Sequence, residues 1–224
     1  MIKSLTKKIL FPVLKYAYNI YASKERSYTY KGINVRVMPG VFHPGLFFST
    51  KLLIEYISKY DLNDKNILEL GAGSGLISVY CAKLKANVTA SDINPIAVEN
   101  INQNSKLNSV IIKVIESDLF DRIETKEFDY IIINPPYFPK NPNNDEEFAW
   151  FCGNEFQYFK KLFDQMGNYV NNDSKIIMVL SEDCDIEMIK KIGEQSHFIF
   201  TKCYEQKIWG EMNYIFEISK SNIV

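Results

Sequence analysis

The sequence predicts an α/β protein, with a mostly parallel sheet and helices on both of its faces. From residue 66 onward, short apolar runs rich in β-branched residues alternate with longer amphipathic segments. This alternation is typical of parallel strands joined by right-handed helical crossovers. The expected strands cover 66–70, 87–91, 111–116, 128–133 and 175–181, and the expected helices cover 75–84, 95–105 and 154–171.

Both ends of the chain depart from this alternation. Near the N-terminus we expect an amphipathic helix over 4–22 and two short strands within 28–37, around Lys31-Gly32. Ser49 or Thr50 is expected to cap a helix that runs to about residue 60. At the other end a helix over 185–194 should precede strands 197–205 and 212–218. The connection at residues 209–210 is too short for a parallel crossover, so these last strands should pair antiparallel.

Composition limits the classes of function. The 224 residues suit one domain, and a net charge of -1 with only three arginines gives no electrostatic argument for nucleic acid. Four dispersed cysteines without a C-x-x-C pair and two histidines predict reduced thiols, a cytoplasmic location and no metal site. No stretch approaches the roughly 18 apolar residues of a membrane span.

A glycine turn follows the first strand of the alternating region. Leu70 is followed by Gly71-Ala72-Gly73-Ser74-Gly75, and Glu69 precedes the turn. Glycines permit positive φ and close approach of a ligand to the backbone. A dinucleotide fingerprint would require glycine at position 76, where Leu76 stands. An acid beside the turn would repel a pyrophosphate and suit a cationic aminoacyl group.

Acidic residues also end the next two expected strands. Asp92, followed by Ile93, stands about 20 residues beyond the turn, where a carboxylate can bind ribose hydroxyls. Asp118, followed by Leu119, ends the third strand, where an exocyclic adenine amine could lie. Each acid alone is more often a helix cap or a solvated loop residue. Together with the glycine turn they indicate a nucleoside site.

The stretch Asn134-Pro135-Pro136-Tyr137 ends the fourth strand. Two prolines supply no N–H to a neighbouring strand, so carbonyl oxygens there stay available beside the Asn134 amide and the Tyr137 ring. These groups suit a flat –NH₂ group, whose hydrogens need acceptors and whose plane needs a stacking partner. The polar loop from Phe138 to Trp150 is expected to be a mobile substrate lid. Trp150 and Trp209 are expected to be packing residues.

These motifs resemble the class I S-adenosylmethionine-dependent methyltransferases over roughly residues 35–218. The resemblance implies a Rossmann-like seven-stranded sheet of order 3-2-1-4-5-7-6 with the last strand antiparallel, and S-adenosylmethionine as the cofactor. It assigns residues 1–34 to an N-terminal helix and the start of a hairpin, and 35–224 to the methyltransferase domain. The implied cofactor-binding residues are Glu69, Gly71, Ala72, Gly73, Gly75, Asp92, Ile93, Asp118, Leu119 and Thr50, and the implied catalytic residues are Asn134, Pro135, Pro136 and Tyr137.

Within that class the N-P-P-Y motif, the Val41–Thr50 loop and Trp150–Asn154 look like the HemK-type release-factor glutamine methyltransferases. The resemblance implies N-methylation of a planar nitrogen, with a protein glutamine side chain as the first candidate. Only about 30 residues precede the matching region here, which leaves open a need for a small activating partner. An RNA base remains an alternative acceptor, and a non-catalytic binding subunit is a third hypothesis.

Overall fold

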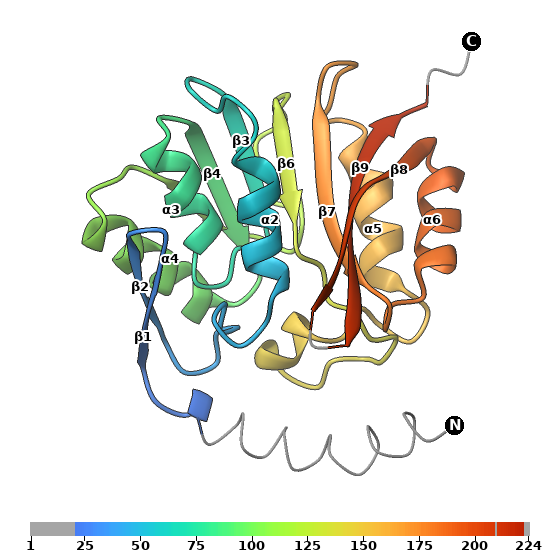
Figure 1. Cartoon of the computed structure of the whole chain (residues 1–224). Coiled ribbons are helices and arrows are strands. Elements are labelled where there is room, and N and C mark those ends of the chain that lie inside the picture. Colours follow the sequence, from blue (N-terminus) through green and yellow to red (C-terminus); the bar gives the residue numbers. More distant parts are fainter. Residues whose placement is uncertain (1–20, 209, 222–224) are drawn as a thin grey trace.

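The computed structural model describes residues 21–208 and 210–221 (Figure 1). The helix expected over 4–22 therefore lies almost wholly outside the described residues, as does Trp209. A two-stranded hairpin and helix α2 precede the alternating region, and a long antiparallel pair ends it. The elements are β1 Arg26–Tyr30, β2 Ile33–Val37, α2 Ser49–Ile57, β3 Asn66–Leu70, α3 Leu76–Lys83, β4 Asn87–Asp92, α4 Pro95–Leu107, β5 Lys113–Glu116, β6 Tyr130–Ile133, η1 Asp145–Ala149, α5 Gln157–Met166, β7 Lys175–Ser181, α6 Ile186–Gln195, β8 Phe198–Ile208 and β9 Glu211–Lys220.

Seven strands form one twisted sheet of order β5-β4-β3-β6-β7-β9-β8 (Figure 1). Numbered from β3, this is the expected order 3-2-1-4-5-7-6. Strands β3 to β7 run parallel, and β9 pairs antiparallel with both β7 and β8. The predicted Rossmann-like fold is confirmed. Because parallel strands end at one edge, the segments that follow β3, β4, β5 and β6 all meet there.

The sheet is buried on both faces by two large apolar clusters, and a small third cluster includes Ala90 of β4 and Ile101 of α4. Leu68 and Ile131 point to the face covered by α5 and α6, whereas Ile67 and Ile132 point to the face covered by α2 and α3. Alternation along a strand sends successive side chains to opposite faces, so a strand buried on both sides reads as a continuous apolar run. Helix α4 covers the β4 and β5 end of the second face.

The hairpin does not join the large sheet. Lys31 and Gly32 both have positive φ, as a tight two-residue turn requires, and the two strands pair antiparallel around them. The outer edge of β2 is bonded instead by three asparagines spaced four residues apart, two on one face of α4 and the third at its C-cap position. Asn100, Asn104 and Asn108 bond the backbones of Met38, Arg36 and Asn34 respectively, with Asn100 reaching Arg36 as well. A helix spacing of four residues matches every second residue of a strand. We call these three residues the asparagine ladder.

Most element boundaries lie within a few residues of expectation, and three elements differ more clearly. Strand β5 starts two residues late, after Ile111, which is 93% exposed. Helix α5 is shorter than the expected 154–171, because Phe156 before it has a left-handed φ of 59° and Gly167 follows it. Strand β8 continues to Ile208 and carries a bulge between Lys202 and Tyr204.

The expected cap of α2 is wrong. Phe48 is the N-cap residue, and no side chain bonds the first turn. Ser49 and Thr50 are already helical and buried, so their hydroxyls face the interior instead of the free N–H groups.

Candidate functional site

The glycine turn lies between β3 and α3 and closes on the neighbouring strand. Gly71, Gly73 and Gly75 all have left-handed φ, and Gly75 is the N-cap residue of α3. The buried Ala72 donates its N–H to Ser91 O at 3.0 Å. A Cβ added at Gly71 would meet no atom within 4 Å. The turn therefore leaves backbone accessible at the carboxyl edge of the sheet, as the sequence predicts.

Asp92 at the end of β4 lies directly beside this turn. Its Oδ2 accepts the Gly73 N–H at 2.8 Å, and its Oδ1 accepts the Asn94 N–H at 2.9 Å. Each carboxylate oxygen can accept a further bond, so ribose hydroxyls remain suitable donors. Burial raises the pKa of Asp92, whereas these N–H groups lower it. Ile93, also expected at the site, is half-buried next to Asp92.

Asp118 and Leu119 follow β5 at the same edge of the sheet. Asp118 is exposed and forms an ion pair with Lys161 of α5 at 2.6 Å. Leu119 is buried and has a left-handed φ of 53°, which turns the chain sharply after the acid. The sequence identifies the acid, but it does not reveal the lysine.

Glu69 lies beneath the glycine turn and is 5% exposed. Its carboxyl group accepts a hydrogen bond from the hydroxyl of Ser78, which lies on α3. Burial raises the pKa of Glu69 to about 8, although the Ser78 bond lowers it. The carboxyl group is therefore mostly protonated at neutral pH in the free protein. A cation placed nearby would favour its ionised form.

The catalytic candidates form a compact turn after β6. The parallel ladder with β7 ends at Ile133, and buried Pro135 and Pro136 follow the half-buried Asn134. The Tyr137 hydroxyl donates to Asn134 Oδ1 at 3.1 Å. Burial raises the pKa of the Tyr137 phenol, so the phenol remains a neutral donor. The turn thus fixes one amide side chain at the edge where the glycine turn ends.

The segment after this turn is anchored as well. Tyr137 N and Phe138 N both bond to Trp150 O, at 3.1 and 2.9 Å, and Asn141 and Asn154 exchange bonds at 3.2 and 2.9 Å. The 3₁₀ helix η1 lies within it. The loop expected as a lid therefore has its own local structure, and its mobility stays a prediction.

An aromatic cluster joins this segment to the loop that precedes α2. The Trp150 ring lies 5.4 Å from Phe42 and 5.0 Å from Phe47, between ring centroids. A Cβ added at Gly73 would lie 3.8 Å from Phe42 Cβ, so the cluster stands next to the glycine turn. Trp150 is a packing residue as expected. The joint role of the three rings has no signal in the sequence, because they come from distant segments.

Thr50, the remaining predicted cofactor residue, is 6% exposed in the first turn of α2.

No helix in the described part of the chain is long and apolar enough to cross a membrane. Among residues 21–208 and 210–221, no group of three or more His, Cys, Asp and Glu is placed to hold a metal ion.

Comparison with known proteins gives the family. The model of the methyltransferase small domain matches residues 32–196. A Methanocaldococcus jannaschii protein provisionally named protein N5-glutamine methyltransferase is 43% identical over 110 residues, which cover 49% of this chain and 53% of that protein. The release factor glutamine methyltransferase of Lactococcus lactis is 30% identical over 172 residues, which cover 71% of this chain and 60% of that protein.

A solved structure agrees with the fold. The T. thermophilus 16S rRNA N2 methyltransferase, in complex with AdoMet and guanosine, superposes with a TM-score of 0.66 at 17% identity, covering 89% of this chain and 50% of that one. This chain spans about half the length of the relatives it matches. The match over residues 32–196 and the sheet order together show that the chain belongs to the methyltransferase small-domain family of S-adenosylmethionine-dependent methyltransferases.

Proposed function

We propose that this protein transfers a methyl group from S-adenosylmethionine to a planar nitrogen, and that the acceptor is a glutamine side chain of a protein. The observation that carries the proposal is the turn after β6. There Asn134 Oδ1, bonded by the Tyr137 hydroxyl at 3.1 Å, stands at the same sheet edge as the glycine turn and Asp92. Asn134 and Gly71 follow paired residues of the neighbouring strands β6 and β3, and this adjacency supports the proposal.

The residues present fit the cofactor by their chemistry. The positive φ of Gly71 and Gly73 exposes backbone for close approach, and a Cβ at either position would only fill that space. Carboxylate oxygens of Asp92 match the two ribose hydroxyls, and a buried carboxyl group at Glu69 matches a cationic amino acid moiety. When bound, the cofactor supplies a methyl group on a positively charged sulfur.

The protein's part in the reaction is orientation. An amide nitrogen is a poor nucleophile because its lone pair is delocalised. Asn134 Oδ1 and the Pro135 carbonyl would accept its two hydrogens and turn the lone pair toward the methyl group. The N–C bond forms as the S–C bond breaks with its electron pair left on sulfur. The nitrogen, then cationic, loses one proton to water, so no strong general base is needed.

Charge around the acceptor side favours a protein over RNA. We define the acidic rim as the eight carboxylates of segments 138–153, 182–187 and 210–211. The same segments contain one lysine, Lys140. Cys184 and Glu211 from these segments both lie close enough to Tyr137 to raise its pKa. Carboxylates repel a phosphate backbone and attract a basic polypeptide. The members of the rim are Asp145, Glu146, Glu147, Glu182, Asp183, Asp185, Glu187 and Glu211.

The experiment that tests the proposal follows the methyl group. Purified protein is incubated with tritium-labelled S-adenosylmethionine and either cell-extract proteins or total RNA, and labelled protein is digested to amino acids. We expect labelled N5-methylglutamine and no labelled nucleoside. Asn134→Ala should lower the single-turnover rate by about 10² to 10³ with unchanged cofactor affinity. Asn63→Ala, an exposed asparagine remote from the catalytic turn, is the matched control.

The outcomes separate the competing functions. Label in RNA alone would favour the RNA base acceptor. Binding of the cofactor without transfer to either fraction would favour a non-catalytic subunit, or a need for the small activating partner. A wild-type rate in Asn134→Ala would contradict the role given to the turn.

A further inference from the structure

One face of helix α5 is tied to the loop that follows β5. Lys161 Nζ lies 2.6 Å from Asp118 Oδ2 and 2.7 Å from Asp121 Oδ2. One helical turn later, Gln165 donates to Asp121 Oδ1 at 2.7 Å and accepts the Phe120 N–H at 3.3 Å. Two side chains of the helix therefore hold both ends of the short segment 118–121.

This arrangement leaves one oxygen of Asp118 for a ligand. Lys161 Nζ donates to Oδ2 of the Asp118 carboxylate. Among the described residues, Oδ1 of that carboxylate accepts no hydrogen bond from the protein. The carboxylate cannot rotate freely, because Lys161 is itself fixed between two acids. Leu119, with its left-handed φ, turns the chain so that the acid stands at the end of β5. The lysine thus selects one orientation of the Asp118 carboxylate.

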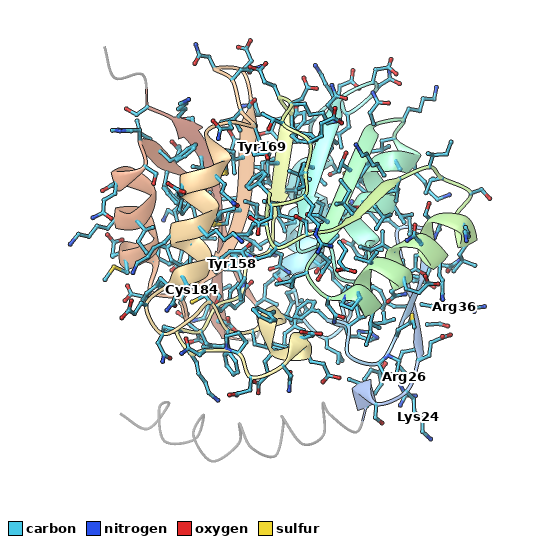
Figure 2. The ribbon with its side chains drawn as sticks, turned by 180° about the vertical axis from the view of Figure 1, so that it is seen from behind. Lys24, Arg26, Arg36, Tyr158, Tyr169 and Cys184 are labelled. Atoms are coloured by element: carbon cyan, nitrogen blue, oxygen red, sulfur yellow. The ribbon has the colours of Figure 1, made fainter. Side chains whose placement is uncertain are left out.

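Helix α5 also faces the rest of the cofactor edge. Tyr158 lies one turn before Lys161 on the same face, and its backbone N–H bonds Cys152 O at 3.0 Å. After burial, the charges of Asp92 and Asp118 are the largest causes that raise the pKa of Tyr158. Figure 2 shows Tyr158 at the lower end of α5, near the edge where the strands end. The face that carries Lys161 therefore borders the site, although Lys161 and both of its carboxylate partners remain partly exposed to solvent.

An ordinary surface ion pair contributes little to the stability of a protein, because solvent screens it. Lys161 differs from such a pair in two respects. Its side chain is only 33% exposed, and it bonds two carboxylates that belong to one loop. The neighbouring Lys160 is 56% exposed and approaches Glu155 only to 3.9 Å. Lys160 is thus a matched control on the same helix.

We propose that Lys161 is a positioning residue for the adenine end of the cofactor: through Oδ2 it fixes the Asp118 carboxylate so that Oδ1 accepts the exocyclic amine of adenine. The inference rests on the proposed function, because it requires an adenosyl ligand at this edge. Lys161 acts only through Asp118 and touches no ligand itself. Without the lysine, the acid gains rotational freedom and solvent, so the bond to the amine weakens.

The test compares two ligands that differ at the adenine amine. S-adenosylhomocysteine carries the amine, and S-inosylhomocysteine carries an oxygen there, which cannot donate to a carboxylate. Calorimetric titration of the wild-type protein should show a preference of about tenfold or more for the adenosyl ligand. Asp118→Asn and Lys161→Met should each reduce this ratio of affinities to about threefold or less. Lys160→Met should keep the wild-type preference.

Further variants and outcomes keep the test decisive. Lys161→Arg retains the positive charge and should restore most of the preference, which a general loss of folding would not allow. A full preference in Lys161→Met, or no preference in the wild-type protein, would overturn the inference while leaving the proposed function intact. Failure of the wild-type protein to bind either ligand would overturn the inference and count against the proposed function as well.

Discussion

At the scale of single residues, the hydroxyl of Tyr137 and the amide of Asn134 form one unit. The hydroxyl donates to Asn134 Oδ1 at 3.1 Å, which fixes the amide orientation with its oxygen toward the tyrosine and available to a second donor. An amide held in one orientation before substrate binds costs no reorganisation during reaction. The phenol can do this at any ordinary pH, since burial raises its pKa.

Removing the hydroxyl alone should therefore slow methyl transfer without removing the ring. We expect Tyr137→Phe to lower the single-turnover rate by about tenfold, the equivalent of one neutral hydrogen bond. Cofactor affinity should stay at the wild-type value, because the bond lies on the acceptor side. The check is rapid-quench kinetics at saturating S-adenosylmethionine. An unchanged rate would mean that the amide is fixed by other contacts.

Glu69 makes cofactor affinity depend on pH. Burial raises its pKa to about 8, so the free protein holds a proton there at neutral pH. A bound cation lowers that pKa, and binding then releases the proton. Affinity for S-adenosylmethionine should increase with pH up to about 8, by at most about tenfold per pH unit, and level off above.

Calorimetry in buffers of different ionisation enthalpy checks this directly, because it counts the protons released on binding. Glu69→Gln keeps the size of the side chain and cannot ionise. It should bind more weakly, with affinity independent of pH over the same range. If the variant retained the pH dependence of the wild-type protein, the proton would come from another group.

At the scale of elements, the asparagine ladder hydrogen-bonds the backbone at the outer edge of β2, as a neighbouring strand would. Asn104 accepts the Arg36 N–H at 2.8 Å and donates to Arg36 O at 2.7 Å and to Ser74 O at 2.8 Å. It therefore connects the hairpin, the helix and the glycine turn. A buried side chain with three such bonds leaves several groups unsatisfied when it is removed.

We expect Asn104→Leu to lower the free energy of unfolding by about 3 kcal/mol. Urea denaturation followed by circular dichroism measures this change. Asn102→Leu is the control, because Asn102 lies on the same helix and its side chain, within the part of the chain that the structure describes, bonds only Val98 O of its own helix, at 3.0 Å. It should cost less than about 1 kcal/mol. Equal losses of unfolding free energy in the two variants would show that the ladder stabilises the protein no more than a bond within one helix does.

At the scale of the whole molecule, charge is distributed unevenly. The chain has a net charge of -1, whereas the acidic rim alone contains eight carboxylates against one lysine. The remainder of the chain is therefore positive. Exposed charges interact over about 8 Å at physiological ionic strength, so the rim acts on a partner that approaches the site.

A basic acceptor should consequently bind more weakly as salt increases. Between about 50 and 300 mM NaCl we expect KM for a basic glutamine-containing peptide to rise severalfold with kcat nearly constant. The double variant Asp145→Asn/Glu182→Gln should have a higher KM at low salt and a flatter salt response. Glu99→Gln/Glu194→Gln removes two exposed charges elsewhere and should match the wild-type protein. A KM that changes neither with salt concentration nor in the double variant of the acidic rim would contradict docking by charge.

Local patterns suffice for most of the chain. The five parallel strands, the glycine turn, Asp92, Asp118 and the turn at Asn134 all follow from apolar periodicity, glycine and proline chemistry and strand-end position. The order of the sheet came from the family resemblance, and the antiparallel end came from the short connection at 209–210. The predicted helix and strand boundaries were wrong where a residue with left-handed φ, such as Phe156, or an exposed residue, such as Ile111, interrupted a regular pattern.

The sequence by itself determined the fold class and predicted that Asp92, Asp118 and Asn134 follow the ends of strands, because each depends on residues near in the chain. Only the tertiary structure revealed Lys161 on Asp118, the asparagine ladder against β2 and the aromatic cluster at Trp150. These contacts join positions between 43 and 108 residues apart. No local pattern encodes them, since they exist only when packing of the sheet and helices brings distant segments to one edge.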